Sequence, residues 1–116
     1  MKPQSAKAKG RNLQKWMRDL ILENFTDLEP DDVRSTSMGA GGEDLQLSPA
    51  ARRRFPYSVE AKNCERLNVW GAYEQAAANS GKHEPLLVMK KNRKKPLVVL
   101  DAEAFIELVK LANESC

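Results

Sequence analysis

The chain has 116 residues, of which 41% are hydrophobic and 30% are charged, and its formal net charge is +3 at pH 7. This balance excludes an intrinsically disordered chain and predicts one small folded domain with a modest core. Two cysteines, Cys64 and Cys116, are too few for a disulfide framework or a zinc-ligand spacing. No apolar run approaches the roughly 20 residues that cross a bilayer, so we expect a cytoplasmic protein without a membrane partner.

The charges are unevenly distributed along the chain. Residues 1–18 carry lysines and arginines but no acid, whereas residues 19–32 carry acids but no base. Such separation predicts a surface with distinct basic regions, for which phosphate-bearing partners are the usual ligands. We expect residues 1–10 to form a flexible basic arm and residues 11–116 to form the single domain.

The first half of the chain predicts one helix followed by three strands. Apolar residues recur at helical spacing over residues 11–25, and an acidic loop with Pro30 ends that helix. Short strands are predicted over residues 33–38 and 44–47, joined by a flexible glycine-rich turn. Residues 48–54, with three consecutive arginines, are interpreted as a turn before the next strand, residues 57–62. An antiparallel hairpin or meander is the simplest arrangement of the three strands.

The second half predicts a helix, two strands and a last helix. Residues 64–79 show helical periodicity, with Leu67, Trp70, Tyr73, Ala76 and Ala77 on one side. Apolar runs at 85–90 and 96–100 predict two strands that flank a basic hairpin tip, residues 91–95. Asp101 is the expected N-cap of a helix over 102–113, whose predicted buried face is formed by Phe105, Ile106, Leu108, Val109 and Ala112. The order αβββαββα predicts an α/β fold with a central mixed five-stranded sheet flanked by helices.

Asp44, Glu60 and Lys62 form a candidate magnesium site. Side chains alternate between the faces of a strand, so Glu60 and Lys62 point to one face while Val59 and Ala61 point to the other. Carboxylates bind hard cations, and a neighbouring ammonium group can position a water molecule or stabilise negative charge. The alternative is a structural salt bridge between Glu60 and Lys62, because an E-x-K tripeptide alone has low specificity.

The order of these motifs resembles the PD-(D/E)xK nuclease superfamily, and within it the small archaeal-type and phage Holliday junction resolvases. The resemblance extends from about Lys9 to Leu100. Its pieces, in chain order, are Lys9-Gly10, Val33-Arg34-Ser35, Asp44-Leu45, Glu60-Ala61-Lys62, the Trp70 helix, and Pro85 with Leu87 and Lys90. The resemblance implies a restriction-endonuclease-like fold and a Mg²⁺-dependent endonuclease, with Mn²⁺ as a substitute. It further implies that a homodimer resolves four-way or branched DNA junctions in the cytoplasm of a prokaryotic or phage-infected cell.

The resemblance also assigns roles to the candidate site. It implies that Asp44 and Glu60 bind one or two Mg²⁺ ions together with the Ala61 carbonyl. Lys62 would orient the attacking water or help to deprotonate it. Glu43 is a rival ligand; we prefer Asp44, because Leu45 and Leu47 then face the core together.

Two glutamines are further candidates. Gln14 occupies the position of the family's first-helix acid, a role that Asp19 or Glu23 would take in a different helix register. Gln75 lies in the helix after the E-x-K strand, where related nucleases place a polar residue near the metal; a solvent-facing glutamine is the alternative. Trp16 and Trp70 are interpreted as core or dimer-interface residues.

Basic and hydroxyl residues in several segments are candidate contacts to DNA phosphates: Lys9, Arg11, Arg34, Ser35, Ser37, Arg52, Arg53, Arg54, Lys90, Lys91, Arg93, Lys94 and Lys95. Basic clusters are typical footprints of nucleic-acid binding, although solvated turns carry them as well. Shape and backbone contacts are expected to dominate recognition. The alternatives to junction resolution are a non-catalytic DNA-binding protein of the same fold and a nicking, restriction-like or repair nuclease.

Overall fold

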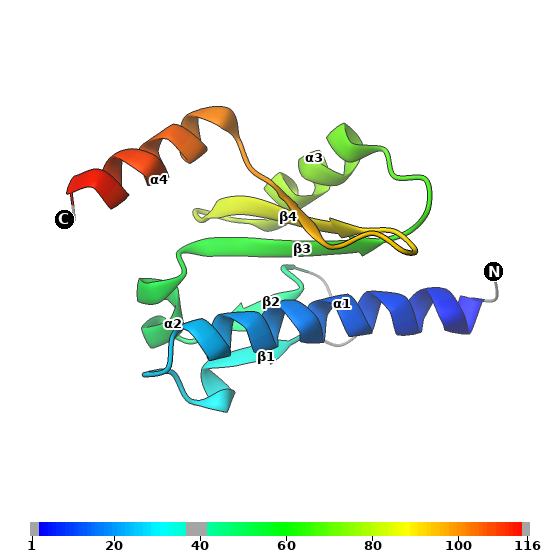
Figure 1. Cartoon of the computed structure of the whole chain (residues 1–116), viewed down its shortest axis with the longest axis horizontal. Coiled ribbons are helices and arrows are strands. Elements are labelled where there is room, and N and C mark those ends of the chain that lie inside the picture. The colour runs from blue at the N-terminus through cyan, green and yellow to red at the C-terminus, as the bar shows by residue number, and fades with distance from the viewer. Residues whose placement is uncertain (1–2, 37–41, 115–116) are drawn as a thin grey trace.

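The computed structural model describes residues 3–36 and 42–114 and has an α/β architecture, as expected (Figure 1). Its elements are α1 (Pro3–Asn24), η1 (Pro30–Asp32), β1 (Val33–Ser35), β2 (Leu45–Leu47), α2 (Pro49–Arg54), β3 (Tyr57–Asn63), α3 (Val69–Asn79), β4 (Glu84–Lys90), β5 (Leu97–Val99) and α4 (Ala102–Glu114). Ser37 and most of the predicted glycine-rich turn lie outside the described residues. None of the helices in the described part of the chain has the length and apolar composition needed to cross a membrane.

The predicted five-stranded sheet is wrong, because the strands form two separate sheets. β1 and β2 pair antiparallel, as the hairpin predicted, whereas β3, β4 and β5 form a three-stranded sheet in that order. The two sheets meet at Asp44, whose N–H donates to the Val59 carbonyl at 2.8 Å. β2 ends at Leu47 because α2 begins at Pro49, and a strand this short does not continue the pairing along β3. At Ala61 the backbone N–H donates to the Asp44 carboxylate instead of to a neighbouring strand.

The three-stranded sheet provides the centre of the molecule. β3 runs parallel to β4, and β4 pairs antiparallel with β5, as predicted for the 91–95 hairpin. α1 covers one face of this sheet and α3 covers the other (Figure 1). The core on the α1 side is made of apolar side chains from α1, both hairpin strands, β3 and β4: Leu13, Met17, Ile21, Val33, Leu45, Val59, Ala61, Leu86 and Val88. The alternation of β3 therefore buries Val59 and Ala61 against α1, as predicted.

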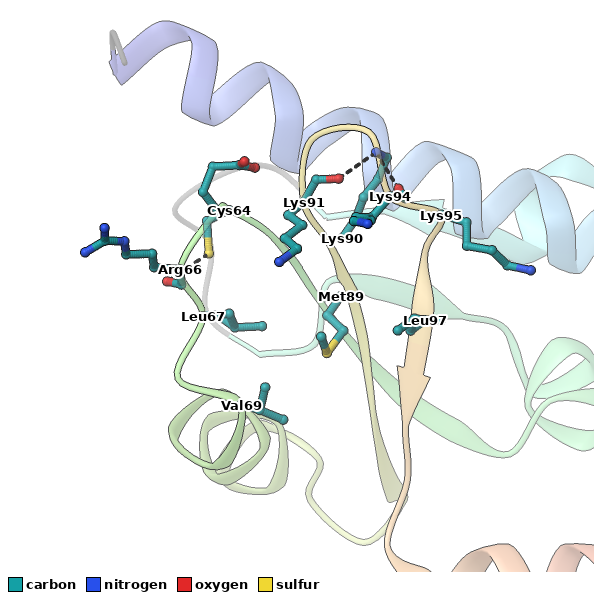
Figure 2. Close-up of a pocket in the computed structure, with 11 residues that line it drawn as sticks. Cys64, Arg66, Leu67, Val69, Met89, Lys90, Lys91, Lys94, Lys95 and Leu97 are labelled. Atoms are coloured by element: carbon teal, nitrogen blue, oxygen red, sulfur yellow. Dashed lines mark hydrogen bonds between the residues drawn. The ribbon is translucent and has the colours of Figure 1, made fainter.

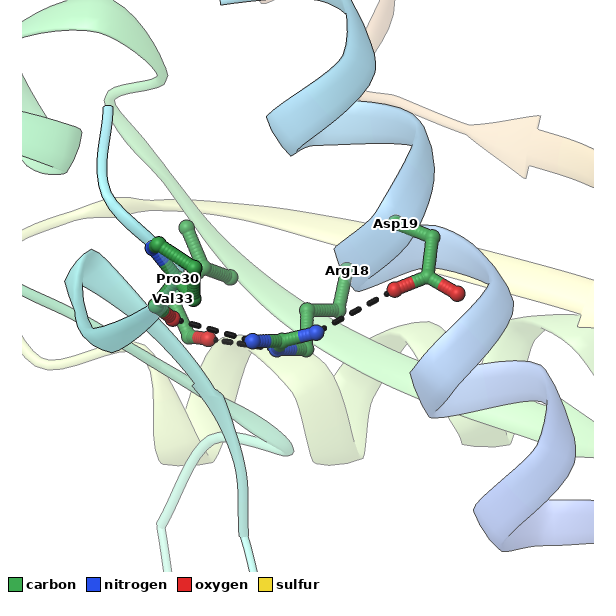
Figure 3. A network of polar contacts seen from close by, with 4 residues as sticks. All are labelled: Arg18, Asp19, Pro30 and Val33. Atoms are coloured by element: carbon green, nitrogen blue, oxygen red, sulfur yellow. Dashed lines mark hydrogen bonds and ion pairs between the residues drawn. The ribbon is translucent and has the colours of Figure 1, made fainter. Parts of the chain in front are cut away.

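α1 begins at Pro3, before the predicted helix start at residue 11, and so includes residues 3–10, which were expected to form a flexible arm. The lysine- and alanine-bearing segment simply continues the helix, since lysine and alanine are good helix formers. The other half of α1 is anchored by Arg18, whose guanidinium donates to the Val33 carbonyl at 2.7 Å and the Pro30 carbonyl at 3.0 Å (Figure 3). Arg18 thus fixes α1 against the start of β1.

The three-arginine segment is a short helix, α2, and not the predicted turn. Ser48 is its N-cap and accepts a hydrogen bond from the Ala51 N–H at 3.1 Å, and Pro49 occupies the first helical turn. Serine followed by proline is a typical helix start, because both satisfy the unpaired N–H groups at that end. α2 places its arginines near the beginning of β3.

Among the residues predicted on one side of α3, Ala76 is buried, whereas the predicted buried face of α4 is wrong. α3 buries Ala72 and Ala76 against the sheet, whereas Trp70 is 80% exposed. α4 begins after the predicted N-cap, since Asp101 accepts from the Ala104 N–H at 3.0 Å. Yet none of the residues of α4 is buried within the described chain, and its predicted inward side chains point to solvent.

Candidate active site

Asp44 connects the small hairpin to β3 and is half-buried. Its Oδ2 accepts a hydrogen bond from the Ala61 N–H at 2.7 Å, which holds the carboxylate beside the edge of β3. Burial raises the pKa of Asp44, although the Ala61 N–H and the charge of Lys62 act in the opposite direction. The carboxylate is therefore costly to ionise unless positive charge is added nearby.

Glu60 is the second acid of the site and is only 4% exposed. Burial raises its pKa, and the negative charge of Asp44 raises it further. Glu60 Oε1 accepts from Asn79 Nδ2 at 3.2 Å, and Lys62 Nζ lies 3.7 Å from Glu60 Oε2. When ionised, the two acids and the one ammonium group carry a net negative charge.

This arrangement fits a hard cation through two carboxylates and one backbone oxygen. The N–H and C=O of one residue in a strand point to the same side, so the Ala61 carbonyl lies on the strand edge that faces Asp44. Carboxylate and carbonyl oxygens are the ligands that Mg²⁺ takes, with water completing its shell. Across the described residues, no three His, Cys, Asp or Glu side chains gather into one metal-binding group. The fit thus rests on Asp44, Glu60 and the Ala61 backbone.

Glu43, the rival ligand, is held by another partner. Its Oε1 accepts from Arg52 Nη2 at 2.6 Å, and both side chains are only 19% exposed. Arg52 also donates to the Tyr57 carbonyl at 2.9 Å. This ion pair neutralises Glu43 and favours Asp44 as the acid of the site, in agreement with the burial of Leu45 on the opposite side of β2.

The two predicted glutamines lie in different surroundings. Gln14 is 4% exposed in α1, and its Oε1 accepts from Ser35 Oγ at 2.6 Å rather than contacting either carboxylate. Ser35 is the register partner of Leu45, the residue after Asp44, so Gln14 contacts the hairpin next to the site. Gln75 is exposed, and Asn79, one helical turn further along α3, contacts Glu60 instead. Asn79, which ends the predicted helix over residues 64–79, was missed in the sequence because no local pattern links it to Glu60.

The predicted DNA-binding residues divide between opposite ends of β3 (Figure 1). At its beginning, Arg52 binds Glu43, and Arg54 pairs with Asp27 at 3.2 Å and lies over the Phe25 ring. Arg53 is exposed on the same helix. Arg34 pairs with Asp31 at 3.5 Å on the nearby surface. Most arginines at this end therefore already have acidic partners.

At the other end of β3, basic residues from three elements gather. Lys9 Nζ donates to Asn92 Oδ1 at 2.7 Å, and Asn63 Nδ2 donates to the Lys9 carbonyl at 3.2 Å. These two contacts join α1 to the end of β3 and to the β4–β5 turn. Lys90 donates to the carbonyls of Lys91 and Lys94 and so stabilises the turn itself. The remaining cations of the turn are exposed, as is Arg11 on α1: Lys91, Arg93, Lys94 and Lys95.

A cavity of about 570 Å³ lies beside this turn (Figure 2). Its apolar lining comes from Leu67, Val69, Met89 and Leu97, and the lysines of the turn and Arg66 surround it. Glu65 ties the cavity wall to the turn by accepting from the Asn92 N–H at 2.6 Å. Met89 is the register partner of Lys62 in β4, so the cavity adjoins the end of β3 that carries Lys62.

Comparisons with known proteins add no relative: no family model, curated protein or solved structure matches the chain.

Proposed function

We propose that this chain is a Mg²⁺-dependent endonuclease of the PD-(D/E)xK type that cuts four-way or branched DNA junctions as a homodimer. The observation that carries the proposal is the hydrogen bond from the Ala61 N–H to Asp44 Oδ2, which holds a half-buried acid beside the strand residue that follows the buried Glu60. Burial raises the pKa values of both acids, and the charge of Asp44 raises that of Glu60 further. Such perturbed acids cluster at functional sites more often than in ordinary surface ion pairs.

Each residue of the site would have a separate role in phosphodiester hydrolysis. Mg²⁺ bound by the two carboxylates and the Ala61 carbonyl would neutralise charge on the scissile phosphate and lower the pKa of a water molecule. The Ala61 N–H fixes the Asp44 carboxylate, and Asn79 fixes that of Glu60. Lys62 is one third exposed and lies 3.7 Å from Glu60, and in this proposal it would orient the attacking water and balance the charge that develops on the phosphate. The expected products carry a 3′-hydroxyl and a 5′-phosphate.

The basic end of β3 supports DNA as the substrate. Lys9 contacts Asn63, the residue after Lys62, and Asn92 in the β4–β5 turn, so a DNA backbone contacted by Lys9 and the lysines of the turn would run close to Lys62. Such contacts neutralise phosphates without reading bases, which suits an enzyme that recognises the shape of a junction. Paired cuts on a symmetric junction need two copies of the site, and hence a homodimer.

One observation favours a second candidate, a non-catalytic DNA-binding protein of the same fold. The described residues supply two acids to the site and not three, and Gln14 stands where the family has a first-helix acid. A chain that has lost a metal ligand would retain the basic surface and bind DNA without cutting it.

A cleavage assay separates these functions. The purified chain is incubated with a labelled four-way junction, a linear duplex and a single strand, each with Mg²⁺ or with EDTA. Junction cutting in Mg²⁺ alone supports the proposal, whereas equal cutting of the linear duplex would identify a different nuclease. Binding without cutting would identify the DNA-binding protein.

A Glu60→Gln protein provides the test of the site itself. Glutamine keeps the size of the side chain and its contact with Asn79 but removes the charge needed for the cation. Cutting of the junction should be lost while its binding is retained. Cleavage at the parental rate would show that the active site lies elsewhere.

A further inference from the structure

α4 is an amphipathic helix whose apolar side faces solvent. Phe105 is 52% exposed, Ile106 63%, Leu108 43% and Val109 40%. A helix of 13 residues is marginal in water on its own, and its stability comes from packing its apolar face. The rest of the described chain does not cover that face, and Figure 1 shows α4 standing apart from α3. A surface outside this protomer is therefore needed to stabilise the helix.

A second apolar surface lies next to the beginning of α4. Trp70 on α3 is 80% exposed, and Leu97 on β5, whose side chain lines a cavity together with Val69 of α3, is 53% exposed. A cavity of about 370 Å³ between α3 and the β5–α4 connection is lined by Val69, Trp70, Tyr73, Val99, Leu100, Asp101 and Ala102. β5 pairs with β4 alone among the described strands, so its other edge is open. We call this surface the α3–β5 groove.

We propose that a second copy of this chain covers both surfaces, with α4 of each protomer packed into the α3–β5 groove of the other. The helix and the groove adjoin in one protomer, so a single two-fold axis can bring both contacts together. The exposed side chains of α4 together with Trp70 and Leu97 are large and apolar, as in the core of a standard interface, which buries roughly 800 Å² on each partner. Exposed apolar surface of this kind marks protein interaction sites.

Charge favours a second copy over a lipid surface as the occupant. The polar side of α4 carries Glu103, Glu107 and Glu114 against one base, Lys110. Helices that lie on membranes carry lysine and arginine on the polar side, which anionic headgroups attract. The acids of α4 instead complement a chain with a net charge of +3, whose Lys95 precedes the open strand β5. The acidic rim of one protomer can thus meet basic residues of the other.

Light scattering of the full chain, without DNA, tests the proposal at micromolar concentrations. The parent should have the mass of two chains. Ile106→Lys in α4 and Trp70→Lys in the groove should each raise the dissociation constant at least about 100-fold, because each change occurs twice in a symmetric interface. Trp16→Lys is the matched control, since Trp16 is 44% exposed on α1 and is not among the residues that line the α3–β5 groove, so this change should leave the dimer intact.

The variants should remain folded, because Ile106 and Trp70 lie outside the buried core. Circular dichroism and a thermal melt check this for each protein. A monomeric parent, or a dimer that persists with either Ile106→Lys or Trp70→Lys, would overturn the inference. A monomer that sediments with phosphatidylcholine vesicles would show that lipid covers α4 instead. The inference rests on the proposed function only in that a junction-cutting enzyme would use a dimer. A dimer that does not cleave DNA would contradict the proposed function alone, whereas a monomer that cleaves DNA would contradict the proposed interface.

Discussion

The two ends of β3 use charge in opposite ways. Where β3 begins, Arg52 is paired with Glu43 at 2.6 Å and Arg54 with Asp27 at 3.2 Å, so the arginines are engaged in the fold. In the middle of β3, the half-buried Asp44 and the buried Glu60 have the cation Lys62 nearby, and at the far end the lysines of the β4–β5 turn are exposed. Paired charges hold elements together, whereas a surplus of one sign attracts a ligand. Two basic runs that look alike in the sequence therefore have different expected roles.

The largest expected effect is on cleavage, through the acids of the site. Asp44→Asn keeps the side-chain size and removes one negative charge, and the single-turnover rate of junction cutting should fall at least about 100-fold. The adjacent Glu43→Gln is the matched control, because Glu43 contacts Arg52, and cutting should remain near the parental rate. Equal losses for the two variants would remove the distinction between these neighbouring acids.

The next effect is on stability at the arginine end. Arg52→Ala removes the partner of the half-buried Glu43 and the donor to the Tyr57 carbonyl, and should lower the free energy of unfolding by about 2 kcal/mol. Arg54→Ala breaks a more exposed pair and should cost less than about 1 kcal/mol. Urea denaturation measures both values. A larger loss for Arg54→Ala would contradict this ranking of the two pairs.

DNA affinity should separate the two basic ends. If each lysine contacts one phosphate, the Lys91→Ala/Lys94→Ala protein should bind a junction about 10- to 30-fold more weakly at physiological salt, and the slope of log K against log salt should decrease by about 2. The Arg53→Ala/Arg54→Ala protein loses the same formal charge at the other end. Fluorescence anisotropy across a salt series compares them, and an equal change of slope would show that both ends contact DNA.

The smallest effect is the response of stability to pH and Mg²⁺. Burial raises the pKa values of Asp44 and Glu60, so the folded protein binds more protons than the unfolded chain. The two acids therefore contribute to the free energy of unfolding at pH values below their pKa values in the unfolded chain. This contribution is lost as the pH rises through their higher pKa values in the folded protein. At the arginine end, hydrogen bonds from Ser48 and from the Glu29 backbone lower the pKa of Asp32, whose contribution is lost as the pH falls.

Denaturation of the parent protein in EDTA should therefore show that the free energy of unfolding falls as the pH rises across the mildly acidic range. This fall should be smaller for Asp44→Asn. In neutral buffer, Mg²⁺ at ten times its dissociation constant should raise the free energy of unfolding of the parent protein by about 1.4 kcal/mol. The same concentration of Mg²⁺ should raise that of Asp44→Asn by much less. An equal gain for both proteins would place the cation elsewhere.

Local patterns in the sequence predicted much of the fold. Strand alternation placed Val59 and Ala61 in the core and Glu60 beside Lys62, and Asp101 was correctly predicted as the N-cap of α4. The start of α1 and the helical nature of α2 were wrong, because good helix formers at Pro3–Gly10 and the Ser48-Pro49 start were interpreted as irregular segments. Both helix starts could therefore have been predicted from residues next to them in the sequence.

Partners distant in the chain could not be inferred from local patterns. The pairing of β3 with β4, the division into two sheets at Asp44 and the contact of Asn79 with Glu60 all join residues separated by long stretches of sequence. The helical spacing of apolar residues in α4 was recognised in the sequence. Such spacing predicts that one face of the helix will be covered, but it does not identify the surface that covers it. The sequence by itself determined the residue types, the local elements and the spacing of Glu60 and Lys62. Only the tertiary structure decided which charges are paired and which apolar faces stay open, because both depend on contacts between elements.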